Sequence, residues 1–179
     1  MTTFAASIAT GILLILFGVL IYAPKSNLRS YVLEFPRSNH CSLWLVTLAT
    51  VWFLWRHIAN LGEADFGSYK LLIGGIAVVV AVLSFKYTPD FLAVRGLAML
   101  VLLFSREVLD ALFLQEAFTR LFLVTIIYLL IVLALYFGAW PYRMRDCITW
   151  LNEKSGRFEA LGVFIVFCGI LISILSLTY

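Results

Sequence analysis

The chain has 179 residues, of which 63% are hydrophobic and only 13% are charged. An average soluble domain is about 45 to 50% apolar and about 25% charged, so this sequence has too few polar side chains to cover a surface in water. The formal net charge is +3, and the cations are spread over several connecting segments, which argues against a nucleic-acid-binding protein. Composition therefore predicts a single transmembrane helical domain over residues 1–179.

Five segments are apolar for long enough to cross a hydrocarbon layer of about 30 Å, which takes about 20 helical residues. They are residues 4–22, 41–57, 69–85, 121–140 and 161–176. A sixth segment, residues 91–113, is long enough but contains four charged side chains, Arg95, Arg106, Glu107 and Asp110. We expect an all-α integral membrane protein with a bundle of six transmembrane helices, or five if this fourth hydrophobic segment is re-entrant.

Two connecting segments have the apolar spacing of short amphipathic helices. The first, at residues 24–40, has apolar side chains at i, i+3, i+4 and i+7, namely Leu28, Tyr31, Val32 and Phe35. The second, at residues 142–154, has the corresponding set Met144, Cys147, Ile148 and Leu151. Short helices with one apolar and one basic face lie in the membrane interface, so we expect both segments there.

Lysine and arginine counts in the short loops predict the orientation. The first, third and fifth loops hold eight: Lys25, Arg29, Arg37, Lys86, Arg143, Arg145, Lys154 and Arg157. The opposite side holds four: Arg56, Lys70, Arg106 and Arg120. Because cytoplasmic loops are enriched in these residues, we expect a multi-pass protein of a cytoplasmic or inner membrane with both termini outside. The N-terminal segment lacks the basic start of a signal peptide, so we expect it to remain as the first span.

A polar stripe, defined as Arg95, Arg106 and Asp110, runs along the sixth candidate segment. At 100° per residue, Arg95 and Arg106 point within about 20° of each other, and Asp110 lies about 60° from Arg95. Arg106 and Asp110 are also an i, i+4 pair that can neutralise each other. One interpretation is that the arginines snorkel to the membrane surfaces and fix the depth of the helix. The other is that the polar stripe faces protein and meets nearby acids, for which the candidates are Glu34, Glu63, Asp65, Asp90 and Glu107.

An aromatic and basic group follows the fifth apolar segment. It consists of Trp140, Tyr142, Arg143 and Arg145. Aromatic rings at headgroup depth beside cations are able to bind an anionic lipid, although the same residues also serve as simple membrane anchors. The sequence predicts a lipid headgroup contact here as one of these two alternatives.

Glycines seven residues apart mark two helix faces. Gly11 and Gly18 lie in the first apolar segment, and Gly162 and Gly169 lie in the last. Small residues let membrane helices approach closely, so we expect tight contacts at these faces, within the chain or between copies. The adjacent Gly74 and Gly75 suggest a further close contact.

Motifs for catalysis or for a cofactor are missing from the sequence. His40 and His57 lie at opposite ends of the second apolar segment, about 25 Å apart, so they cannot ligate one haem together. The three cysteines have no metal-like spacing and do not form a disulfide framework. We expect no cofactor and no metal.

Three functions remain open on this basis. The first is a non-enzymatic membrane subunit or scaffold, whose partners are the lipid bilayer and other membrane subunits or a second copy. The second is a small ion or proton channel or transporter that uses the polar stripe. The third is a lipid-modifying enzyme, which the missing catalytic motifs disfavour.

Overall fold

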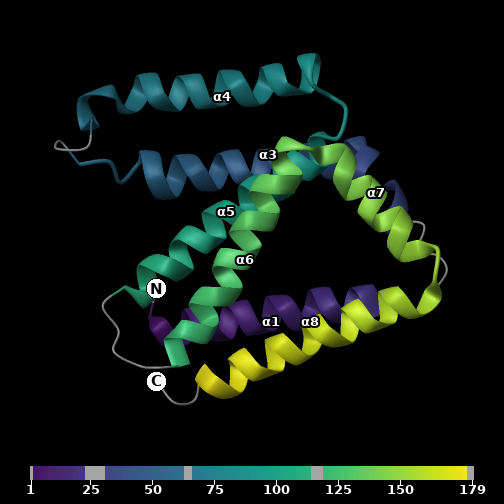
Figure 1. The fold of residues 1–179 in the computed structure, drawn as a ribbon. Coiled ribbons are helices and arrows are strands. Elements are labelled where there is room, and N and C mark those ends of the chain that lie inside the picture. Colours follow the sequence, from purple (N-terminus) through teal and green to yellow (C-terminus); the bar gives the residue numbers. More distant parts are fainter. Residues whose placement is uncertain (1, 23–30, 63–65, 114–118, 177–179) are drawn as a thin grey trace.

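The computed structural model describes residues 2–22, 31–62, 66–113 and 119–176, and within these ranges it is helical with no strand. The long helices are α1 (Thr3–Tyr22), α3 (Asn39–Phe53), α4 (Lys70–Tyr87), α5 (Leu92–Leu112), α6 (Thr119–Ala139) and α8 (Ser155–Leu175). The shorter elements are α7 (Pro141–Asn152) and the turns η1 (Phe35–Arg37), η2 (Leu54–Ile58) and η4 (Gly67–Tyr69). The expected all-α fold is confirmed, and Figure 1 shows its arrangement.

Five helices are long and apolar enough to cross a membrane, as the sequence predicted. They are Thr3–Tyr22, Asn39–Ile58, Gly67–Tyr87, Arg120–Ala139 and Gly156–Leu175. The helix outside this group is α5, because it contains the four charged residues. It is nevertheless one uninterrupted helix of 21 residues, about 31 Å at 1.5 Å per residue.

Local sequence signals explain where several helices begin. The Ser38 hydroxyl accepts a hydrogen bond from the Cys41 N–H at 3.3 Å and so caps the first turn of α3. Pro141 opens α7, where its missing N–H has no helical partner to lose. Pro89 lies in the turn between α4 and α5. These boundaries follow from the chemistry of the capping residues and need no tertiary contact.

Helices α1 and α8 pack face to face along their length, because glycines let their backbones meet. A Cβ built on Gly11 would lie 3.0 Å from the carbonyl oxygen of Gly169, and one built on Gly162 would lie 2.9 Å from that of Gly18. The first glycine of one helix therefore faces the second glycine of the other, and the two helices are antiparallel. The close contact predicted from these residues is formed within the chain.

Helix α5 lies between α3 and α6. Toward the start of α5, Gly96 packs against Leu45 and Val46 of α3, and toward its end Glu107 bonds Arg56 of η2. Both partners advance in the same direction, so α5 and α3 are parallel.

Where α5 and α6 pack, their chain directions are opposite. Ala98 near the start of α5 approaches Gly138 near the end of α6, at 3.4 Å from a Cβ built there. Val108, close to the end of α5, packs in one cluster with Leu123 and Ile127 at the start of α6. These two helices are therefore antiparallel.

An aliphatic cluster forms where the starts of α1 and α6 meet the ends of α5 and α8. Its buried members, each only 0 to 2% exposed, are Ala6, Val108, Leu112, Leu123, Ile127 and Ile172. The buried hydroxyls of Ser7 and Thr10 beside it donate to carbonyls of their own helix, at Thr3 and Ala6. The junction of these four helices is thus packed with apolar side chains.

Helix α4 lies at the edge of the bundle, next to α3 and η2 (Figure 1). None of its residues is buried. A Cβ on Gly74 would make ordinary contacts with Leu54 and Ile58 at 3.5 and 3.6 Å, whereas one on Gly75 would have nothing within 4 Å. The expected glycine contact is therefore loose and involves Gly74 alone.

The helix directions give the bundle two ends. The start of α4 lies beside the end of η2, and both labelled termini lie at this same end in Figure 1. We call it the Arg56 end, where α1, α4 and α6 begin and where η2, α5 and α8 finish. We call the opposite end, which contains η1 and α7, the α7 end.

The second amphipathic segment is helical as predicted. Of its apolar stripe, Ile148 is buried at 8% exposure and Met144 and Leu151 are half-buried against the rest of the protein, whereas Cys147 is exposed. The exposed side of α7 presents Tyr142 and Trp150. The position of this helix in the membrane interface stays a prediction.

The first amphipathic segment is described only in part. Leu28 lies outside the described residues, and residues 31–34 form a helical turn that leads into η1. Tyr31 is exposed, whereas Pro36 is buried where η1 packs on α5.

Candidate functional site: a charged cluster at the Arg56 end

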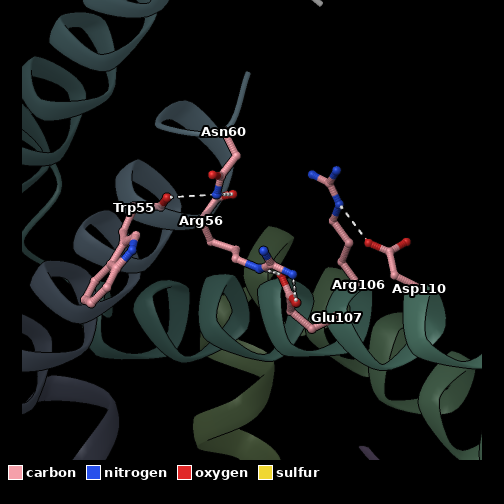
Figure 2. Close-up of polar contacts among 6 residues, drawn as sticks. All are labelled: Trp55, Arg56, Asn60, Arg106, Glu107 and Asp110. Carbon is pink, nitrogen blue, oxygen red and sulfur yellow. Dashed lines mark hydrogen bonds and ion pairs between the residues drawn. The ribbon is translucent and has the colours of Figure 1, made fainter. Parts of the chain in front are cut away.

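A bidentate ion pair between Arg56 and Glu107 joins η2 to α5 (Figure 2). The Arg56 Nε donates to Glu107 Oε1 at 2.8 Å, and its Nη2 donates to Oε2 at 3.0 Å. The arginine side chain is 52% exposed and the glutamate side chain only 11%. Paired bonds between a guanidinium and a carboxylate fix orientation as well as distance, so this contact ties the ends of two parallel helices together.

Arg56 lies in a π-helical turn, η2. The Ala59 N–H donates to the Leu54 carbonyl five residues earlier, at 2.9 Å. Such a turn leaves carbonyls without their usual donors, and here the Asn60 side chain donates to Trp55 O and Arg56 O at 3.4 and 2.9 Å. Isolated π turns inside α-helices are rare and are frequent at functional sites.

Only two of the three residues of the polar stripe interact with each other. Arg106 Nε and Asp110 Oδ2 lie 3.8 Å apart on the outward side of α5, and these side chains are 61% and 70% exposed. Figure 2 shows both side chains standing clear of the Arg56–Glu107 pair. Arg95 is half-buried at the α7 end, and among the residues that the structure describes no carboxylate lies within ion-pair distance of it. Arg106 and Asp110 therefore point away from the aliphatic cluster.

The acids predicted as partners of the polar stripe fall into three groups. Glu63 and Asp65 lie outside the described residues. Glu34 and Asp90 are exposed at the α7 end. Glu107 bonds Arg56 rather than either arginine of the stripe, because it points toward α3 while Arg106 points outward. The sequence missed this pairing, since only the packing of α3 on α5 brings the two residues together.

A histidine and a serine near the cluster have buried polar atoms. Within the described ranges, neither His57 Nε2 nor Ser105 Oγ has a hydrogen-bond partner. The His57 ring lies against Phe53, with 5.8 Å between ring centroids. His40 is exposed at the other end of α3, so the two histidines are far apart as predicted.

The chemistry available to this cluster is ionic. Over the residues that the structure describes, no group of three or more His, Cys, Asp or Glu side chains is placed to hold a metal ion. The ion pair can hold two helices in register, and His57 beside four charged residues can take up a proton. The three cysteines are separate thiols in different helices, and of these Cys147 is exposed.

The aromatic and basic group lies around the start of α7. Trp140 and Tyr142 are exposed, and the Trp140 ring lies 5.4 Å from that of Tyr136. Arg143 lies over the Tyr142 ring, and a hydrogen bond with Tyr142 raises the pKa of this guanidinium above its ordinary value. Arg145 bonds the neighbouring Asp146 at 2.8 Å, so part of its charge is neutralised.

Comparison with known proteins adds no family to this description. The chain matches no protein-family model, and comparison with curated proteins and with solved structures finds no similar one. Its function is therefore argued from its own residues.

Proposed function

We propose that this chain is a non-enzymatic, six-span integral membrane protein that serves as a subunit or scaffold of a membrane protein assembly. The observation that supports this most directly is the placement of charge. Aliphatic side chains fill the junction of α1, α5, α6 and α8, whereas the Arg106–Asp110 pair lies on the outward side of α5. An apolar junction beside an ionic outer face suits a protein that binds a neighbour in the membrane better than one that conducts ions through itself.

The antiparallel packing of α1 and α8 supports an even number of crossings. Two neighbouring helices that both span a membrane in opposite directions begin on opposite sides of it. Five crossings would make the first and last helices parallel, whereas the glycine contacts make them antiparallel. With five apolar helices of sufficient length, α5 is the helix that supplies the sixth crossing.

The positions of the charges in α5 are compatible with that crossing. Arg95 is three residues from the start of the helix, about 4.5 Å along the axis, and Arg106 is six residues from its end, about 9 Å. Arginine side chains extend toward the nearer headgroup layer, which relieves most of the cost of a charge in a span. Glu107 lies at a similar depth and has Arg56 as its counter-ion.

An assembly would cover surfaces that a single chain leaves open. Helix α4 packs mainly on α3 and the adjoining turns and has no buried residue, and the outward side of α5 holds an exposed ion pair. A charged pair at the side of a span costs less against polar groups of another protein than against acyl chains. A partner helix on α5 would meet this requirement.

The test is purification of the full chain from its native membranes in mild detergent, followed by native mass spectrometry. We expect an assembly of fixed stoichiometry that is heavier than the monomer. Arg95→Leu and Asp110→Asn, which alter the polar stripe, should weaken it, whereas Lys154→Gln in the exposed α7–α8 connection should leave it intact. A chain that remains monomeric in every detergent and lipid mixture contradicts the proposal.

A proton channel or transporter is the second candidate, favoured by one specific observation. His57 has a buried nitrogen without a partner among the described residues and interacts electrostatically with Arg106, Glu107 and Asp110. Histidine is the side chain that most often carries protons between sites in proteins. Liposomes that contain the purified chain decide between the two: we expect no ion or proton flux at any pH or voltage, and a flux that Asp110→Asn abolishes would favour transport instead.

A further inference from the structure

Cations lie over aromatic rings at only one end of the bundle, as far as the structure describes the chain. The four pairs are Arg37 on Phe91, Lys86 on Tyr87, Arg143 on Tyr142 and Arg157 on Trp150. The distances from cation to ring centroid range from 3.9 to 5.7 Å, within the range of attractive cation–π contacts. All four pairs belong to the α7 end, and they come from η1, α4, the residue before α5, α7 and α8.

The closest of these pairs is held by further bonds. Arg157 stacks at 3.9 Å on Trp150, donates to the Trp150 carbonyl at 2.8 Å and lies 3.5 Å from a Glu153 oxygen. These contacts fix the turn between α7 and α8. The exposed side of α7 therefore presents aromatic rings and guanidinium groups in set positions.

Cations are more numerous at the α7 end. Among the described residues this end holds seven Lys and Arg and five Asp and Glu, and the Arg56 end holds four and two. The net charge of the described residues is therefore +2 at both ends, but more cations lie where the aromatic rings are paired with them.

We propose that the α7 end is a docking surface for the anionic phospholipid headgroups of the leaflet that it faces. The inference rests on the membrane placement proposed above. Aromatic rings settle at headgroup depth because one part of the ring system is apolar and the other is wetted. Cations beside them meet lipid phosphates there, and each basic residue near an anionic surface adds to the attraction.

A lipid surface fits this end better than an acidic protein does. The rings that accompany the cations are themselves exposed: Tyr87, Tyr142 and Trp150. Two of them adjoin the ends of the apolar helices α4 and α6, so the aromatic positions continue directly from helix sides that are also exposed and apolar. A water-soluble acidic protein would pair with the cations but would give no reason for the exposed aromatic rings.

The experiment measures thermal unfolding of the full chain in a neutral detergent with added phosphatidylglycerol or phosphatidylcholine. We expect phosphatidylglycerol to raise the unfolding midpoint by several degrees more than phosphatidylcholine does. The variant Lys86→Gln/Arg143→Gln should lose at least half of this difference. The control Lys70→Gln/Arg120→Gln, which removes two cations from the Arg56 end, should keep it. Native mass spectrometry provides a second readout, in which the first variant retains fewer phosphatidylglycerol molecules than the control.

Three results would overturn the proposal. They are an equal effect of the two lipids, an equal loss in both double variants, and full reproduction of the effect by free glycerol phosphate. None of them bears on whether the chain spans a membrane or joins an assembly, because those properties are measured by side-specific labelling and by mass in mild detergent. Failure of this inference is thus distinguishable from failure of the proposed function.

Discussion

Arg56 and Glu107 are 51 residues apart in the sequence, yet they share two short hydrogen bonds. The bonds depend on the π-helical turn of η2 and on the parallel packing of α3 against α5. Arg106 and Asp110, by contrast, are neighbours on one helix and meet at 3.8 Å with both side chains well exposed. The two ion pairs therefore differ in what they stabilise: the first joins helices, and the second belongs to one helix.

Removing the charge of Glu107 should lower stability more than removing that of Asp110. Glu107→Gln leaves a guanidinium without its counter-ion, whereas Asp110→Asn interrupts a long and exposed contact that contributes little. We expect Glu107→Gln to lower the midpoint of thermal unfolding in detergent by a few degrees and Asp110→Asn to change it hardly at all.

The double variant Arg56→Gln/Glu107→Gln provides the control. If the two residues act through their mutual bonds, the double variant loses less than the sum of the single losses. Strict additivity would mean that the pair contributes nothing to stability.

Cys147 is the exposed thiol on α7, and its reaction with maleimide should depend on pH in a defined way. The residue is exposed as a whole, but protein atoms around the sulfur partly desolvate the thiol and raise its pKa above the ordinary value. Since the thiolate is the reacting form, the labelling rate should rise with pH and reach half of its maximum at a higher pH than for a free cysteine peptide. The measurement uses the variant Cys41→Ala/Cys168→Ala, and a midpoint at or below that of the peptide contradicts the expectation.

At the scale of single elements, the glycines of α1 and α8 set how closely these helices approach. A Cβ on Gly162 would lie 2.9 Å from backbone atoms of α1, at Gly18 and Tyr22, and backbone cannot move aside as the end of a flexible side chain can. Gly156 is the second residue of the same helix and has nothing within 4 Å of a Cβ. The two glycines therefore form a matched pair for substitution.

Alanine at these two positions should have opposite effects. Gly162→Ala overpacks the contact and should destabilise the protein by about 1–3 kcal/mol. Gly156→Ala should stabilise it by up to about 1 kcal/mol, because alanine favours a helix more than glycine does. Unfolding of both variants in the same detergent checks this, and equal effects would show that α1 and α8 are not in tight contact.

At the scale of the whole molecule, the direction of each helix decides how often the chain crosses a membrane. Helix α5 is parallel to α3 and antiparallel to α6, as expected for the fourth of six alternating spans. The packing of α5 between α3 and α6 explains how a helix with four charged residues fits at this position. On the sides that meet α3 and α6 it is covered by protein, which leaves the polar stripe for the outward side.

Cysteines placed on either side of α5 test this crossing. Thr88 lies in the turn before the helix and Phe113 directly after it, and both are exposed. In a variant without native cysteines, a membrane-impermeant maleimide should label Thr88→Cys from one side of sealed vesicles and Phe113→Cys only from the other. Labelling of both from the same side means that α5 does not cross, and the six-span proposal then fails.

The sequence alone determined the helices, the five that are long and apolar enough to cross a membrane, and the local contacts. These features depend on composition, on helical periodicity and on neighbours three or four residues apart, as for Arg106 and Asp110. The glycines at 11, 18, 162 and 169 likewise identified two helix faces that need a close partner. All of this is short-range information that the order of residues contains by itself.

Tertiary structure decided which faces meet. It paired the glycine faces within the chain, turned Ile148 toward the bundle and joined Glu107 to Arg56 rather than to the polar stripe. The physical reason is that a membrane is as apolar as a protein interior, so an apolar helix face gives no sign of whether lipid or another helix will cover it. Likewise, the register between α3 and α5 and the π-helical turn that aims Arg56 arise only when the helices pack.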